Sequence, residues 1–126
     1  MMGAMLVRHE PASASAVRRE IALDLDLHGV DPDRIDEVAL VASELIGNAV
    51  RHCDATERNE LDVSWTVGTQ DVVVSVEDPS ETLPVLRHAP PDAPSGRGLT
   101  IVQALTSEWG VEPTQRGKRV WARIDL

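Results

Sequence analysis

The stretch of sequence that decides the fold is residues 44–52, which read Glu44-Leu45-Ile46-Gly47-Asn48-Ala49-Val50-Arg51-His52. It stands at the end of a strongly helical pattern. Side chains four residues apart project side by side from one face of a helix. Glu44 and Asn48 are therefore predicted neighbours, and His52 lies one further turn along the same face.

Apolar residues recur at steps of three and four through the segment that ends in this stretch, which predicts a helix with one buried stripe. The stripe comprises Ile35, Val38, Ala42, Leu45 and Ala49. The helix is expected to begin at Asp31-Pro32, an N-cap residue followed by proline at the first helical position. Glu44 and Asn48 then lie on an adjacent stripe, at the edge of the expected core.

Two further helices are expected. The first follows a turn at Pro11–Ser15, with N-cap candidates at Ser13 and Ser15, and runs to about His28 before Gly29 ends it. The other is predicted by apolar residues at helical spacing and is stopped by Gly110. Its apolar positions are Leu99, Val102, Leu105 and Trp109.

Alternating apolar and polar residues predict strands at 61–67 and 120–126, and residues 5–9 are expected as a short strand. Residues 68–71 are expected as a hairpin turn, and the mostly apolar run at 72–77 indicates a returning strand at the centre of a sheet. Gly117-Lys118 is expected as a turn. The expected order is strand, helix, helix, strand, strand, loop, helix, strand, strand, which fits one sheet with helices packed on one face.

Composition limits the class of protein. The chain has 126 residues, which fits one domain, and its net charge of -9 disfavours a nucleic-acid partner because phosphate binding depends on Lys and Arg. Cys53 is the only cysteine, so no intrachain disulfide forms and a reducing compartment is expected. The N-terminal apolar stretch at residues 3–7 is too short for a signal or a membrane span, and we expect a cytoplasmic protein.

Glu44 and Asn48 are the first candidate site residues. A glutamate and an asparagine on a helix are usually solvated surface residues. However, Asn48 is a poor helix former in mid-helix, flanked by apolar residues. A neutral oxygen ligand for Mg²⁺ is one reason to place it there, and Glu44 could then orient or deprotonate an attacking hydroxyl.

Two later segments add candidates. Asp78 precedes Pro79-Ser80 and is either a turn-forming residue or a carboxylate that accepts a hydrogen bond from the exocyclic amine of adenine. Gly96 and Gly98 flank a loop-to-helix junction, where glycine lets backbone N–H groups approach phosphate. The motif is neither a Walker loop nor a dinucleotide fingerprint, so a mononucleotide held by another geometry remains. Residues 82–95 hold four prolines and are expected as a loop that acts as a lid.

Taken together, these motifs resemble those of the GHKL ATPase superfamily. Residues 44–52 resemble its N box, Asp78-Pro79-Ser80 its first glycine box, and Gly96-Arg97-Gly98-Leu99 its second. Ser43-Glu44-Leu45 and the closing residues 117–121 look more specifically like the RsbW-type anti-sigma-factor serine/threonine kinases of the actinobacterial branch. The resemblance covers about residues 7–126, in the right order and spacing.

The resemblance implies a Bergerat α/β (α+β) sandwich, with one mixed, mostly antiparallel sheet and three helices on one face, that binds ATP and Mg²⁺. Asn48 would hold the metal and Asp78 the adenine amine, and Glu44 would be the general base. The remaining nucleotide-binding positions would be Ser80, Gly96, Arg97, Gly98 and Leu99. In that family the phosphate goes to a serine or threonine of an anti-anti-sigma (STAS) protein, and the kinase also sequesters a sigma factor. Relatives often dimerise through the sheet face or first strand, so a homodimer is left open.

Two positions depart from the family pattern and keep an alternative open. Ser80 stands where the superfamily usually has glycine, and Arg119 stands where threonine is often found. The alternative is an ATP-binding regulatory module with weak or no catalysis that acts by partner binding. A third interpretation is a structural domain independent of ATP.

Overall fold

The computed structural model describes residues 1–52, 60–79 and 97–126. Three helices and five strands follow one another along the chain in these residues. In order, the elements are β1 (Met2–Arg8), α1 (Ser13–Leu27), α2 (Pro32–His52), β2 (Glu60–Val67), β3 (Asp71–Asp78), α3 (Arg97–Leu105), β4 (Glu108–Pro113) and β5 (Lys118–Asp125).

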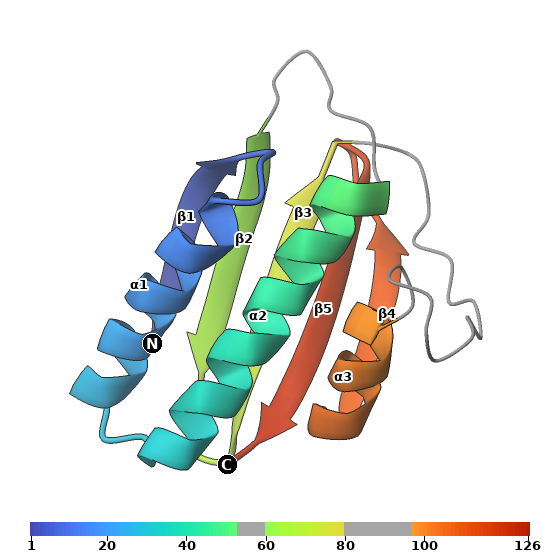
Figure 1. Cartoon of the computed structure of the whole chain (residues 1–126). Coiled ribbons are helices and arrows are strands. Elements are labelled where there is room, and N and C mark those ends of the chain that lie inside the picture. The colour runs from blue at the N-terminus through green and yellow to red at the C-terminus, as the bar shows by residue number, and fades with distance from the viewer. Residues whose placement is uncertain (53–59, 80–96) are drawn as a thin grey trace.

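The strands form one sheet with the order β1-β2-β3-β5-β4, and the three helices lie on one face of it (Figure 1). The expected two-layer α+β sandwich is therefore confirmed, and so is the central position of β3. Each of the four described pairings is antiparallel, so this sheet is antiparallel rather than mixed. Residues alternate between buried and more exposed along β2, β3 and β5, because one sheet face carries the helices.

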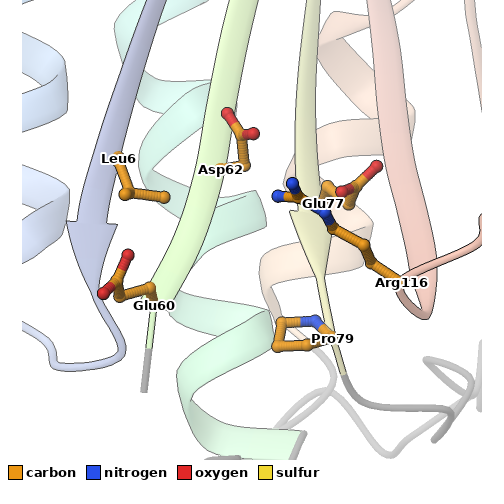
Figure 2. A pocket seen from close by; sticks show the side chains of 6 residues that line it. All are labelled: Leu6, Glu60, Asp62, Glu77, Pro79 and Arg116. Atoms are coloured by element: carbon orange, nitrogen blue, oxygen red, sulfur yellow. The ribbon is translucent and has the colours of Figure 1, made fainter. Parts of the chain in front are cut away.

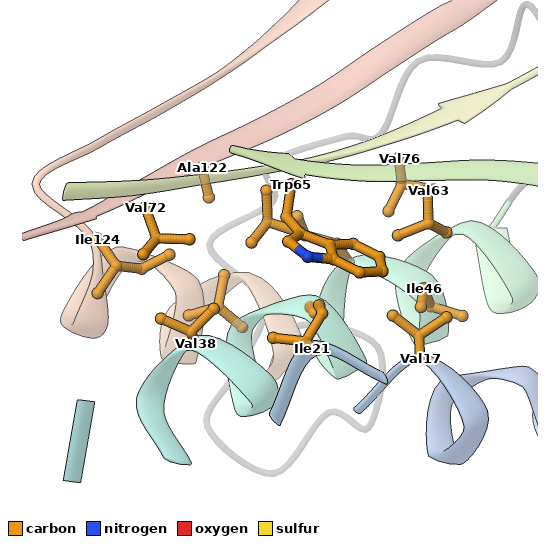
Figure 3. Packing of buried hydrophobic residues seen from close by; sticks show 14 of the residues in the cluster. Val17, Ile21, Val38, Ile46, Val63, Trp65, Val72, Val76, Ala122 and Ile124 are labelled. Atoms are coloured by element: carbon orange, nitrogen blue, oxygen red, sulfur yellow. The ribbon is translucent and has the colours of Figure 1, made fainter. Parts of the chain in front are cut away.

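The core lies between the helices and the sheet and consists mainly of valine, leucine and isoleucine (Figure 3). Trp65 of β2 is its one buried aromatic residue among the described residues, at 2% exposure. The predicted stripe of α2 is buried throughout: Ile35, Val38, Ala42, Leu45 and Ala49.

The ends of α1 and α2 follow from local chemistry. Gly29 has a positive φ of 74°, a conformation that glycine adopts at little cost, and it ends α1 as predicted. Asp31 caps α2: its Oδ1 accepts a hydrogen bond of 2.8 Å from the backbone N–H of Asp33, and Pro32 occupies the first helical position.

The predicted cap of α1 is wrong. Ala12 occupies the N-cap position and makes no side-chain cap. Ser13 is already helical, and its hydroxyl donates a 2.7 Å hydrogen bond to the Arg8 carbonyl at the end of β1. A serine hydroxyl can accept a hydrogen bond from a helix N–H as a cap, or donate one to a nearby carbonyl. Here it donates to the Arg8 carbonyl.

The third helix is shorter than predicted. It ends at Leu105, and Trp109 and Gly110 belong to β4 instead. Lys118 likewise begins β5 rather than completing a turn, which instead spans residues 114–117.

The predicted lid at residues 82–95 lies outside the described residues. In the part of the chain that the structure describes, no helix is long and apolar enough to cross a membrane.

Candidate functional site

The candidate site is formed where α2 packs over β3 and β5. Figure 3 shows Val38 of α2 at the end of the core that holds Val72, and Ile46 at the end that holds Val76. From Val38 to Ile46 the helix advances about 12 Å, and from Val72 to Val76 the strand advances about 13 Å. The helix and β3 therefore run in the same direction, one above the other.

Asn48 follows Ile46 along α2, and Asp78 follows Val76 along β3. Both residues therefore lie at the same end of the core. Asn48 lies about 3 Å further along the helix than Ile46, and Asp78 about 7 Å further along the strand than Val76. Figure 1 shows the C-terminal ends of α2 and β3 and the start of β5 at one end of the molecule. The structure thus brings the two predicted residues to one end of the sandwich.

Polar side chains are rare in the interior and gather at this end. Among the described residues only Ser13, Asn48, Asp78 and Lys118 have buried polar or charged side chains. Asn48 is 5% exposed although it carries a carboxamide. Burying such groups costs free energy unless they are hydrogen bonded, so their concentration at one end of the core is typical of a binding site.

Asp78 and Lys118 form a buried ion pair. They stand opposite each other in the antiparallel pairing of β3 with β5, and both side chains point to the helix-covered face. The Lys118 Nζ atom lies 4.0 Å from Asp78 Oδ2, with side-chain exposures of 2% and 1%. The two opposite charges compensate each other in a region from which water is excluded.

Gly117 allows β5 to approach the end of β3 this closely. A Cβ atom at residue 117 would overlap the carbonyl oxygen of Asp78 and would lie 2.6 Å from the carbonyl carbon of Pro79. Any larger residue would therefore push the strand that carries Lys118 away from Asp78.

The candidate base, Glu44, is half-buried on α2. Its Oε2 lies 4.0 Å from Nη2 of Arg51, and the two side chains are 22% and 47% exposed. The Arg51 side chain passes over Gly47, where an added Cβ would lie 3.2 Å from Nη1. Glu44 thus has a cationic neighbour on the same helix, in a position reached by solvent.

The remaining predicted site residues are less completely defined. Ser80 and Gly96 lie outside the described residues. Residues 97–99 form the first turn of α3, which packs beside α2. The backbone of the second glycine motif therefore does open a helix next to the helix that carries Asn48.

A separate hollow of about 500 Å³ lies on the face of the sheet that carries no helix (Figure 2). Its lining includes three carboxylates, from Glu60, Asp62 and Glu77, and one arginine, Arg116. This charge repels phosphate, so the hollow does not suit a nucleotide.

Arg119 also belongs to this outer face, where it pairs with Glu77 at 3.6 Å and with Glu112 at 3.1 Å. Arg119, which stands where threonine is often found in the family, thus lies away from Asp78 and Asn48.

The donor groups fit a magnesium ion that is held mainly by its substrate. In the part of the chain that is described, no three His, Cys, Asp or Glu side chains come together in a cluster that could hold a metal. Mg²⁺ keeps several waters and is commonly bound by one or two protein oxygens plus substrate phosphates. The buried carboxamide of Asn48, at the polar end of the core, offers one such oxygen.

The sandwich and the polar end of its core define an ATPase-type α+β domain. Residues 7–124 match the family model of the histidine kinase-like ATPase domain. The chain therefore belongs to this family, which includes anti-sigma-factor kinases, and membership implies ATP binding with hydrolysis or phosphotransfer. No curated protein matches the chain.

Sequence reasoning missed Lys118. The signal was present, because the buried series Val120, Ala122 and Ile124 extends back by one step of two residues to Lys118. The sequence analysis instead predicts a turn at Gly117-Lys118. A lysine in phase with core residues is the observation that could have identified it.

Proposed function

We propose that this protein is an ATP-dependent serine/threonine protein kinase that acts as an anti-sigma factor. Its substrate would be a serine or threonine hydroxyl of a STAS-type anti-anti-sigma protein, and its second partner a sigma factor. The observation that carries the proposal is the gathering of Asn48, Asp78 and Lys118 at one end of the core in a chain of this family. The choice of partners rests on the resemblance of residues 43–45 and 117–121 to the RsbW type.

Three residues of the chain have separate roles in this proposal. The Asp78 carboxylate accepts a hydrogen bond from the adenine amine and so fixes the base. The Asn48 carboxamide would hold Mg²⁺, and the ion would supply positive charge against the phosphates. Glu44 lies one helical turn before Asn48, at 22% side-chain exposure, where a partner's hydroxyl can reach it.

In the transfer step, Glu44 takes the proton of the partner's hydroxyl, and the oxygen of that hydroxyl bonds to the γ-phosphorus of ATP. The bond from that phosphorus to the β,γ-bridging oxygen breaks, and ADP leaves. Most of the rate enhancement comes from alignment of the two reactants, because phosphoryl transfer needs little covalent chemistry from the protein.

The test combines binding with transfer. Thermal unfolding is followed with and without Mg-ATP, and the protein is then incubated with γ-labelled ATP and candidate STAS proteins. We expect ATP to raise the melting temperature and label to appear on a serine or threonine of one partner. A pull-down with sigma factors tests the second partner.

Other outcomes distinguish the rival interpretations. ATP binding without transfer to any STAS partner would favour a regulatory module that acts by partner binding alone. No ATP-induced rise in melting temperature would indicate a structural domain and would overturn the proposal.

A further inference from the structure

We propose that the hollow on the outer face of the sheet is a docking site for the sigma factor, and that it takes a lysine or arginine side chain from that protein. The inference rests on the proposed function, in which a sigma factor is the second partner. It assigns this partner to the sheet face that carries no helix, whereas Asn48 and Asp78 belong to the helix-covered side.

Like charges stand close together in the hollow. Leu6, Asp62 and Glu77 lie opposite one another in one row across β1, β2 and β3. Glu60 lies two residues before Asp62 on the same face (Figure 2). Carboxylates directly opposite each other on neighbouring strands destabilise a sheet. The arrangement therefore opposes folding and favours a ligand that brings positive charge.

The chain compensates these carboxylates only in part. Glu77 pairs with Arg119 at 3.6 Å, and that arginine is shared with Glu112. In the part of the chain that the structure describes, no ion pair involves Glu60 or Asp62. Three carboxylates and one arginine line the hollow, so negative charge is in excess there. A cationic group from another molecule would relieve this repulsion.

The shape of the hollow suits a long cationic side chain. Its volume is about 500 Å³, within the usual range of binding clefts. Lysine and arginine pack their aliphatic stems on apolar surface and keep the charged end in a polar environment. Leu6, which is 64% exposed, and Pro79 supply the apolar surface beside the carboxylates.

Of the two proposed partners, the sigma factor has the matching chemistry. A protein that recognises promoter DNA carries lysine and arginine side chains that contact phosphate. A hollow lined by carboxylates attracts the same side chains, and occupying them would keep the sigma factor from DNA. The STAS partner must instead bring its hydroxyl to Glu44 on α2, in the helix layer, and does not need this face.

The experiment measures the affinity of the full chain for a panel of purified sigma factors by calorimetry. We expect one sigma factor to bind, and its affinity to fall by at least about 10-fold between roughly 50 and 300 mM NaCl, because salt screens exposed charges. Glu60→Gln/Asp62→Asn should weaken binding by at least about 10-fold at low salt and should flatten this salt dependence. Leu6→Ser should weaken binding without flattening it.

Variants of α1 supply the matched controls. Glu20→Gln/Asp26→Asn changes the net charge by the same amount with the same residue types, at exposed positions of the helix layer. Leu27→Ser removes a leucine that is 81% exposed on the same helix. Both controls should keep the wild-type affinity and salt dependence.

The substitutions in the hollow should leave the fold and the nucleotide site intact. Gln and Asn keep the shapes of the side chains they replace and remove like-charge repulsion, so the melting temperature of Glu60→Gln/Asp62→Asn should not fall. Its affinity for Mg-ATP and its transfer of label to a STAS partner should stay at wild-type values.

The possible results separate the inference from the proposed function. If the wild-type protein binds no sigma factor, the anti-sigma part of the proposed function fails, and the inference fails with it. If it binds one, and Glu60→Gln/Asp62→Asn binds equally well or no worse than the α1 control, only the inference fails.

Two other results would assign the hollow to a different occupant and overturn the inference. The first is a fall in STAS labelling that parallels the loss of sigma-factor affinity, which would indicate the STAS partner. The second is a homodimer that dissociates in Leu6→Ser while the affinity for the sigma factor stays unchanged, which would indicate a second copy of this chain.

Discussion

His9 and Ala49 are joined across forty positions of sequence by a hydrogen bond to the last turns of α2. The His9 Nε2 atom lies 3.0 Å from the carbonyl oxygen of Ala49. Ala49 has one of the last four carbonyls of the helix, which find no partner within a helix that ends at His52. The segment after β1 therefore fixes the part of α2 that carries Asn48.

His9→Ala should loosen this end of α2. We expect a loss of about 1 kcal/mol in the free energy of unfolding, the usual net value of one hydrogen bond, measured by urea denaturation. The affinity for Mg-ATP should fall in parallel. His28→Ala is the control, because His28 bonds to the Asp24 carbonyl at the end of α1 in an exposed position. An equal loss of nucleotide affinity in both variants would show that His9 has no special link to the site.

Gly117→Ala should disturb the pairing of Asp78 with Lys118. The added methyl group would overlap the backbone of Asp78 and Pro79, which cannot move aside as a flexible side chain can. We expect a loss of about 1–3 kcal/mol in stability, as for other overpacked sites, and a loss of ATP affinity. Gly110→Ala meets only the Trp121 side chain, at 3.0 Å, on the outer face. This control should leave ATP affinity unchanged, and comparable binding losses in both variants would contradict the prediction.

Trp65→Phe should destabilise the core. The indole Nε1 of Trp65 donates a 3.0 Å hydrogen bond to Asp24 Oδ2, which joins β2 to α1. Loss of the donor and of part of the ring should lower the free energy of unfolding by about 1–3 kcal/mol in thermal or urea denaturation. Asp24→Asn keeps an acceptor oxygen and should change stability little. If Asp24→Asn costs as much as Trp65→Phe, the hydrogen bond is not the cause.

The elements that the sequence predicts correctly are those in which local chemistry and burial agree. In α2, the Asp31-Pro32 start and the buried stripe both indicate the same helix, and the structure contains it. The hairpin after β2 was also predictable, because its turn residues lie between an alternating run and a mostly apolar run. The backbone N–H of Gly68 donates to the Asp71 carbonyl in that turn at 2.9 Å.

Trp109 shows why the third helix was predicted to be too long. Leu99, Val102, Leu105 and Trp109 keep a helical spacing, yet Trp109 packs on the core from strand β4. The pairing of β4 with β5, which places Trp109 opposite Ala122, decides this position. Sequence spacing contains no information on which distant strand is available for pairing.

The candidate site was predictable only in part, for the same reason. Asn48 and Asp78 were identified from their local sequence, and the structure brings them to one end of the core. Lys118 becomes a site residue only through the register that sets it opposite Asp78. The alternation along β5 indicates that Lys118 faces the core, but the register depends on the assembled sheet, so local sequence could not show that Asp78 is its partner.

The last prediction separates binding from transfer on α2. Asn48→Ala should abolish Mg-ATP binding, because the buried carboxamide oxygen is the protein ligand expected for the metal. Glu44→Ala should leave ATP affinity near the wild-type value but slow phosphotransfer by roughly 100- to 10,000-fold, the usual contribution of a general base. Calorimetry measures the first effect and transfer of label to a STAS partner the second.

Glu37→Gln supplies the matched control for these two variants. Glu37 is an acid of the same helix, but it pairs with Arg34 at 2.9 Å in the exposed first turns. Binding and transfer should both stay at wild-type values in this variant. Wild-type transfer by Glu44→Ala would remove the general base from the proposed mechanism. Because Arg51 neighbours Glu44 at 4.0 Å, transfer that is slow in Arg51→Met as well would instead show that the pair acts as a unit.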